Sequence, residues 1–198
     1  PIYEAFTNSI EAIRDRQKID STHKGEITIK IYSTETTTPD SYSFSSLSII
    51  DNGIGFNDNQ FQRFNTFRDV RKNYKNLGSG RIQYVHYFDS TNVKSVFEQN
   101  GEFFEREFIA SKNEEFLKHN SLVKHKSCKK VSANKVETKV TFNALLENSG
   151  VYDDLSEQSF KVKLLERYIH YFCHNQNNLP KIKIEFYWVH SQQTHKEK

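Results

Sequence analysis

The spacing of apolar side chains predicts helices in four places along the chain. Residues 2–16 carry apolar side chains at steps of three and four, the period of one helix face, and a second row of the same segment is polar. Residues 158–175 repeat this pattern, and residues 81–88 offer a shorter apolar face for packing. A fourth, short helix is expected within the polar residues 57–77.

Alternation of apolar and polar side chains predicts the strands. Isoleucine alternates with polar residues over 26–33, as it does in a half-buried strand. Residues 34–45 are rich in Thr, Ser, Pro and Asp and are expected to form a loop. Asn100-Gly101 is the strongest hairpin signal in the chain. Strands are expected at residues 26–33, 47–50, 92–98, 102–109, 135–142 and 181–189, with a further strand around Leu122.

The order of these elements predicts an α+β fold with a two-layer α/β sandwich architecture. The chain has 198 residues, which is enough for one sizeable core and too few for two comfortable ones. We therefore expect a single domain over residues 1–190, followed by a polar, frayed tail over residues 191–198.

Composition narrows the class of protein. Hydrophobic residues make up 35% of the chain and charged residues 27%, as in globular rather than disordered proteins. No apolar run is long enough to cross a bilayer and no signal sequence is evident. Cys128 and Cys173 lie far apart, which favours a cytoplasmic setting. The net charge of +3 permits contact with nucleic acid without indicating it.

Because the chain lacks methionine and begins at Pro1, close to its first motif, we expect a piece of a longer protein.

The first predicted helix carries a carboxylate and an amide on one face. Glu4 and Asn8 are four residues apart, so their side chains project one turn above the other. Magnesium prefers oxygen ligands, and an amide oxygen of Asn8 suits it beside phosphate oxygens. A carboxylate one turn away suits holding or deprotonating a water. The alternative interpretation is an ordinary amphipathic helix whose polar row is solvated.

The second motif is Asp51-Asn52-Gly53-Ile54-Gly55, at the end of a predicted strand. A carboxylate there is a good acceptor for the exocyclic amino group of adenine. The two glycines would let the backbone approach a flat base and turn sharply afterwards. A strand followed by an Asn-Gly turn is the alternative interpretation.

The third motif is Gly78-Ser79-Gly80-Arg81, which precedes a predicted helix. Backbone N–H groups at a helix start bind phosphate, and the arginine adds a charged donor. The pattern is neither a P-loop nor part of a Rossmann unit, and by itself a Gly-x-Gly is weak evidence.

In this order and at this spacing, the three motifs resemble the nucleotide site of the GHKL superfamily, which includes gyrase, the ninety-kilodalton heat-shock chaperone, histidine kinases and MutL. The resemblance covers about residues 2–142 and implies a Bergerat fold, whose mixed, mostly antiparallel sheet is covered on one face by helices. It implies that Glu4 is the general base and that Asn8 is the magnesium ligand. It also implies that Asp51 binds the adenine amino group and that Gly53 lies close to the ring.

A softer match follows at residues 137–142. The family often has a Gly-Thr-x-Val-x-Phe strand behind the adenine, in which the threonine hydroxyl supports the base through a water. Glu137 stands where glycine is usual, so the resemblance carries over only Thr138. Alternation typical of a core-facing strand also explains this segment. The residues expected to bind nucleotide are Asn8, Asp51, Gly53, Gly55, Gly78, Ser79, Gly80, Arg81 and Thr138.

The resemblance implies an ATPase domain that binds ATP with magnesium and works as a conformational switch. ATP is expected to order a lid over residues 57–80, and this ordering favours a homodimer or the docking of flanking domains outside this chain. Relatives with this acidic first motif usually need a lysine from a following domain. The isolated domain is therefore expected to hydrolyse ATP slowly or not at all.

Two other functions stay open. A histidine-kinase catalytic domain would pass phosphate to a protein histidine, although Glu4 and Ile10-Glu11-Ala12 are closer to the hydrolysing branch. A non-catalytic ATP-binding module would use the fold as a scaffold. The biological process is not fixed, since repair, chromatin remodelling, chaperone action and antiviral defence all use such domains.

Some charged residues are ambiguous. His170 and His174 are spaced to hold zinc, but no third ligand is evident and a surface pair is expected. Arg71, Lys72 and Lys75 would reach phosphates if the lid closes, and would otherwise be solvated.

Overall fold

The computed structural model describes residues 1–36, 42–66, 80–119, 121–146, 157–189 and 194–196. The helices in this part are α1 (Ile2–Ile19), α2 (Asp58–Asn65), α3 (Gly80–His86), α4 (Glu114–Lys118), α5 (Glu157–His174) and the 3₁₀ turn η1 (Gln176–Asn178). The strands are β1 (Glu26–Glu35), β2 (Tyr42–Asp51), β3 (Phe88–Gln99), β4 (Glu102–Ser111), β5 (Val123–Lys130), β6 (Glu137–Leu145), β7 (Lys181–Val189) and β8 (Thr194–Lys196).

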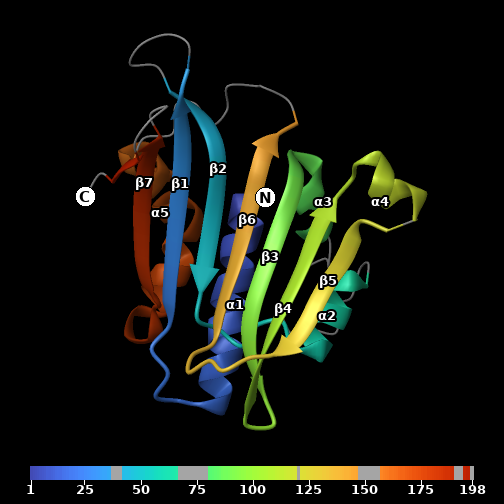
Figure 1. Ribbon diagram of the computed structural model, residues 1–198. Helices are drawn as coiled ribbons and strands as arrows, with labels where there is room; N and C mark the ends of the chain where they lie inside the picture. The colour runs from blue at the N-terminus through green and yellow to red at the C-terminus, as the bar shows by residue number, and fades with distance from the viewer. Residues whose placement is uncertain (37–41, 67–79, 120, 147–156, 190–193, 197–198) are drawn as a thin grey trace.

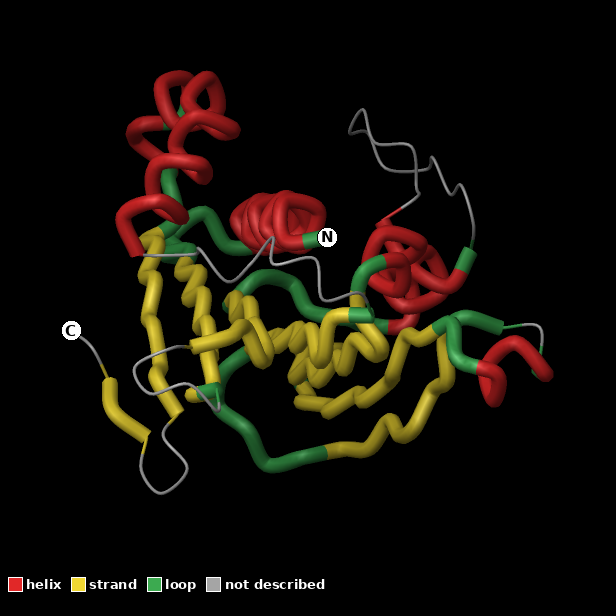
Figure 2. Tube along the Cα trace, turned by 90° about the horizontal axis from the view of Figure 1, so that it is seen from above, coloured by secondary structure: helices red, strands yellow, loops and turns green. Residues whose placement is uncertain are grey.

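The described strands form one sheet in the order β5-β4-β3-β6-β2-β1-β7-β8 (Figure 1). Strands β1 and β7 pair in parallel, and every other neighbouring pair is antiparallel. Viewed from above, α1 and α5 and the helices near β3 and β4 lie on the same side of the sheet (Figure 2). The predicted α+β sandwich, with a mixed, mostly antiparallel sheet, is therefore confirmed.

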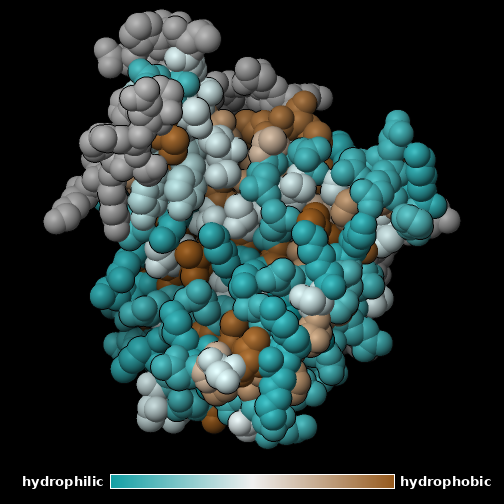
Figure 3. All heavy atoms as spheres, in the orientation of Figure 1, coloured by the Kyte–Doolittle hydropathy of each residue, from teal (hydrophilic) through white to brown (hydrophobic). Residues whose placement is uncertain are grey.

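Strand alternation separates a core face from an outer face. Ile27, Ile29 and Ile31 of β1 are buried and point toward the helices, where Phe6 and Ile10 of α1 pack against the same core. Burying one such side chain contributes roughly 1.5–3 kcal/mol. The opposite face is largely hydrophilic (Figure 3). It carries ion pairs such as Lys94 with Glu105 at 3.0 Å.

The hairpin predicted at Asn100-Gly101 is present between β3 and β4. Both turn residues have positive φ, 55° for Asn100 and 77° for Gly101. A type I′ turn requires this conformation at both central positions, which explains the Asn-Gly pair.

Two expectations from the sequence were wrong, one at the start of β2 and one at residues 194–196. Strand β2 begins at Tyr42, so part of the loop expected at 34–45 is strand, and it pairs with β1 across a register shift. Residues 194–196 form β8 beside β7 rather than a frayed tail. In both places the strand is stabilised by backbone hydrogen bonds to a neighbouring strand. Such hydrogen bonds do not require alternating apolar side chains, so the sequence pattern does not indicate them.

The predicted strand near Leu122 is β5, which runs from Val123 to Lys130 at the edge of the sheet. Most of its side chains are lysine or histidine, which protect an edge strand from pairing with other chains. None of the described helices combines the length and the apolar character that crossing a lipid bilayer requires.

Candidate functional site

Helix α1 places Asn8 against α3. The Asn8 amide donates a hydrogen bond from Nδ2 to Oη of Tyr84, with 3.1 Å between the two atoms. Tyr84 is only 2% exposed, and Glu4 and Asn8 are both half-buried. The polar row predicted on this helix is therefore not a solvated face at this point.

Asp51 ends β2 with its carboxylate under α1. Its side chain is on the core face, since its strand partner Ile27 is buried there. Oδ2 accepts a hydrogen bond from Oγ of Ser9 at 2.9 Å, and Oδ1 accepts one from the backbone N–H of Gly53 at 2.9 Å. Asp51 itself is 5% exposed. The strand-end carboxylate predicted from the sequence is thus buried and oriented by two donors.

Burial changes the acidity of Asp51. Loss of water raises the pKa of its carboxyl to about 6, although the hydrogen bonds from Gly53 and Ser9 act to lower the pKa. The negative charge of Glu137 raises the pKa slightly more. A buried carboxyl group whose pKa is raised in this way is a candidate for a functional site.

The two glycines after Asp51 are required by the protein's own packing. A Cβ on Gly53 would lie 2.6 Å from both the carbonyl carbon and the Cβ of Ala12 in α1. Gly55 has a φ of +76°, and a Cβ there would lie 2.8 Å from Cβ of Phe97. The motif glycines therefore let the loop fit between α1 and β3.

Asn52 also has a structural role. Its Oδ1 accepts a hydrogen bond from the backbone N–H of Glu26 at 2.8 Å, and its Nδ2 donates to the carbonyl of Lys24 at 2.9 Å. Both contacts tie the end of β2 to the start of β1.

Thr138 lies beside Asp51 on the neighbouring strand β6. Its Oγ1 is 2.8 Å from Oγ of Ser95 on β3, and both residues are buried. The Ser95 hydroxyl also accepts a hydrogen bond from the backbone N–H of Phe56 at 2.9 Å. Ser95 thus connects Thr138 to the loop that follows Asp51. Sequence reasoning missed Ser95, because nothing in the alternation of β3 distinguishes it.

Arg106 of β4 is a second residue that sequence reasoning missed. Its guanidinium donates to the carbonyls of Phe56 and Asn57, both at 3.0 Å, and to the carboxylate of Asp58. The ring of Phe61 lies 4.7 Å from its Cζ. This buried cation fixes the segment that leads from Gly55 into α2, whose N-cap is Asn57.

The hydroxyl of Tyr84 is influenced by charged groups of the first two motifs. Its pKa lies above the ordinary value, mainly because the phenol is buried, and the negative charges of Glu4, Asp51 and Glu11 raise it further. Asn8 contacts Tyr84, and the next residue of α1, Ser9, contacts Asp51, so the first two motifs adjoin through α1.

The glycine-rich motif is described only in part. Gly80 starts α3, the helix that carries Tyr84. Gly78 and Ser79 lie outside the described residues, as do Arg71, Lys72 and Lys75, and the side chain of Arg81 is not described. The phosphate contacts predicted for these residues stay predictions.

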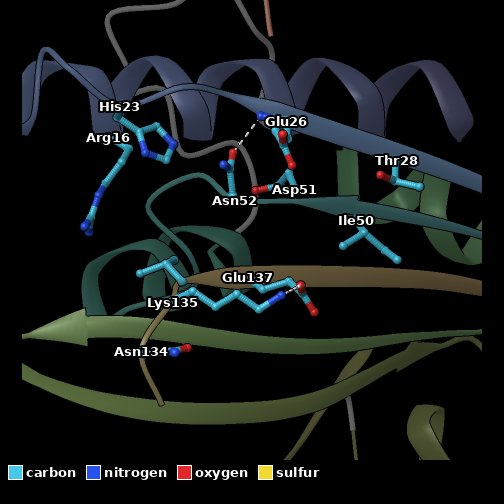
Figure 4. A pocket seen from close by; sticks show the side chains of 11 residues that line it. Arg16, His23, Glu26, Thr28, Ile50, Asp51, Asn52, Asn134, Lys135 and Glu137 are labelled. Carbon is cyan, nitrogen blue, oxygen red and sulfur yellow. Dashed lines mark hydrogen bonds and ion pairs between the residues drawn. The ribbon is translucent and has the colours of Figure 1, made fainter. Parts of the chain in front are cut away.

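A cavity of about 350 Å³ also touches Asp51, and Arg16 of α1 and Asn52 and Lys135 of the strand connections are among its lining residues (Figure 4). Thr28, Ile50 and Glu137 line it, and strand alternation directs these side chains away from the helices. The ion pair between Lys135 and Glu137, with 2.8 Å between Nζ and Oε2, lies at its wall. Because Glu4, Asn8 and Tyr84 do not line it, this cavity is not the predicted nucleotide site.

No cluster of three or more His, Cys, Asp or Glu side chains within the described ranges has the arrangement of a metal site. His170 and His174 are exposed on α5, and Nδ1 of His174 lies 2.8 Å from the carbonyl of His170.

Comparisons with known proteins concern the fold. No protein-family model matches the sequence, and no curated protein matches it. Similar solved structures include the ATPase and transducer domains of DNA topoisomerase II from Balamuthia mandrillaris, with 15% identity and a TM-score of 0.49 over 93% of this chain and 45% of that one. The MutL ATPase domain of Aquifex aeolicus complexed with ADP has 16% identity and a TM-score of 0.41, over 100% of this chain and 61% of that one.

A third similar structure is the N-terminal domain of a DNA repair protein, with 14% identity and a TM-score of 0.44 over 99% of this chain and 51% of that one. Two of these three structures are named as ATPase domains, and at these identities the likeness concerns the fold alone. This chain spans about half the length of these structures. These likenesses therefore concern the fold, and the function of the site is inferred from the geometry of its own residues.

Proposed function

We propose that this chain is an ATP-binding domain of the GHKL type that binds ATP with magnesium and hydrolyses it. The observation that supports the proposal is that α1 contacts both other elements of the site, through the hydrogen bond from Asn8 to Tyr84 and the hydrogen bond from Ser9 to Asp51. Glu4 and Asn8 of α1 and Asp51 of β2, each suited to one part of a magnesium–ATP complex, thus belong to two elements in direct contact.

Asp51 suits recognition of adenine. A carboxylate offers about four acceptor positions, and the donors at Ser9 and Gly53 use one on each oxygen. The remaining positions suit the exocyclic amino group of the base and a water held by Thr138, which is adjacent on β6. Burying a carboxylate costs free energy, and a bound ligand that donates a hydrogen bond would offset part of this cost.

Asn8 suits a magnesium ligand. Nδ2 is engaged by Tyr84, so Oδ1 is the atom left to face an ion. Magnesium is usually held by one or two protein oxygens together with phosphates and waters, so a single amide oxygen fits it. When bound, the ion supplies charge stabilisation at the β- and γ-phosphate oxygens.

Glu4 suits the general base, one helical turn from Asn8. In this proposal its carboxylate orients the attacking water and takes its proton. We further propose that residues 57–80, including the glycine motif Gly78-Ser79-Gly80-Arg81, form a lid over the phosphates. Its ordering by ATP favours homodimerisation or docking of flanking domains in a larger protein, and the isolated domain hydrolyses ATP slowly.

The test is calorimetric titration of the protein with a non-hydrolysable ATP analogue and magnesium. The wild-type protein is expected to bind, and Asp51→Asn is expected to abolish binding. Asp89→Asn, which removes an exposed carboxylate on β3, is the matched control and is expected to bind normally. Unchanged affinity in Asp51→Asn would remove the adenine assignment, and absence of binding in the wild type would remove the proposed function.

A further inference from the structure

We infer that Tyr84 is a positioning residue, whose hydroxyl holds the Asn8 amide in the orientation that presents its oxygen to a magnesium–nucleotide complex. The inference rests on the proposed function and names a residue outside the three motifs. Tyr84 touches neither the nucleotide nor the metal in this role, because it acts through Asn8.

In the structure, the hydrogen bond with Tyr84 goes with one orientation of the Asn8 amide. An asparagine side chain presents an oxygen acceptor at one end and an NH₂ donor at the other, and a half-turn exchanges them. Only the oxygen can bind a cation. The Tyr84 hydroxyl accepts from Nδ2 at 3.1 Å, which directs Oδ1 away from the tyrosine.

Tyr84 is itself held firmly enough to serve this purpose. Its carbonyl accepts a hydrogen bond from Oγ1 of Thr91 at 3.0 Å, inside the core. Its ring packs edge-on against Phe142, with centroids 5.2 Å apart, and lies 5.8 Å from the ring of Phe64 in α2. A side chain locked by its surroundings keeps its hydroxyl in one place, as a positioning contact requires.

The hydroxyl is not needed for packing. A phenylalanine would keep the ring contacts with Phe142 and Phe64, whereas a buried hydroxyl lowers stability unless it is hydrogen-bonded.

The contact also connects two parts of the proposed site. Tyr84 belongs to α3, which starts at Gly80 of the glycine motif, while Asn8 belongs to α1. The orientation of the Asn8 amide therefore depends on the position of α3 relative to α1.

The experiment compares wild type with Tyr84→Phe, which removes one oxygen atom and keeps the ring. Calorimetry measures the affinity for a non-hydrolysable ATP analogue in saturating magnesium and again in EDTA. Removing a contact that orients a metal ligand typically weakens metal binding about 10- to 100-fold. We expect Tyr84→Phe to weaken the affinity in magnesium by about tenfold and to leave the affinity in EDTA unchanged, because Asp51 still binds the base.

Two controls accompany this variant. Tyr187→Phe also removes a hydrogen-bonded hydroxyl, which donates to Glu185 at 2.6 Å on the outer face, and should change neither affinity. In an Asn8→Ala background, Tyr84→Phe should have no further effect on the magnesium dependence, since the two residues act as one unit. Thermal unfolding of each variant reports whether the fold is kept.

The outcomes show whether the role of Tyr84 or the proposed function itself is wrong. Equal losses in magnesium and in EDTA would assign Tyr84 a structural role and overturn the inference, as would no loss at all. Wild-type binding that does not depend on magnesium would also overturn it. If the wild type binds no nucleotide, the proposed function fails and the inference fails with it.

Discussion

Replacing Asp51 by asparagine is expected to stabilise the free protein at neutral and alkaline pH while abolishing nucleotide binding. Burial raises the pKa of Asp51 from 3.8 to about 6, so the folded state resists ionisation of this carboxyl. Asparagine keeps both local hydrogen bonds, because its oxygen accepts from the Gly53 N–H and its NH₂ donates to the Ser9 hydroxyl. It has no charge to bury.

The magnitude follows from the pKa difference. A shift of about two units corresponds to about 3 kcal/mol, taken as an upper value, since each unit is about 1.4 kcal/mol. The sign follows because the pKa of Asp51 is raised in the folded state. The stability that its protonated form contributes is full below about pH 4, is lost as the pH rises through about 6, and then stays constant.

Urea denaturation of both proteins between pH 4 and pH 8 measures this effect. We expect Asp51→Asn to exceed the wild type by up to about 3 kcal/mol at pH 8, by about half of that at pH 5, and by little at pH 4. If Asp51→Asn is less stable than the wild type at pH 8, or if the gap does not change with pH, the buried carboxylate is not strained and the reasoning is refuted.

Three further outcomes are expected. Affinity for ATP should fall as the pH drops below about 6, where Asp51 becomes protonated, and Ser9→Ala should move this midpoint upward because the Ser9 hydrogen bond lowers that pKa. A calorimetric pH series on both proteins checks this, and coincident profiles would contradict it. Gly53→Ala should lower the free energy of unfolding by about 1–3 kcal/mol, because the new Cβ would meet α1, and a wild-type urea midpoint would refute that contact. Glu4→Ala should keep ATP binding and lose turnover in the full-length parent, and undiminished phosphate release would rule out the general base.

The residues that could be predicted from the sequence are those whose chemistry shows in a local pattern. Asp51 follows an apolar run that marks a strand end, and Asn8 follows Glu4 by one helical turn. Ser95, Arg106 and Tyr84 could not be found in this way, because each acts on a partner far along the chain. Tyr84 is 76 residues from Asn8, Ser95 is 43 from Thr138, and Arg106 is 50 from Phe56.

The same distinction holds for the fold. Strand β7 was predicted at its full length, 181–189, because its side chains alternate between core and solvent. Strand β5 was predicted only as a strand around Leu122 and β8 was not predicted, because both lie at the edges of the sheet and are held mainly by backbone pairing. A pattern of side chains reports burial, and it reports little about elements that are held mainly by backbone hydrogen bonds.

The most direct test of the account is a crystal structure of the protein with magnesium and a non-hydrolysable ATP analogue. We expect the exocyclic amino group of the adenine within hydrogen-bonding distance, about 2.7–3.2 Å, of the Asp51 carboxylate, and the metal against Oδ1 of Asn8. A nucleotide bound on the outer face of the sheet, or bound with Asp51 and Asn8 both out of reach, would contradict it.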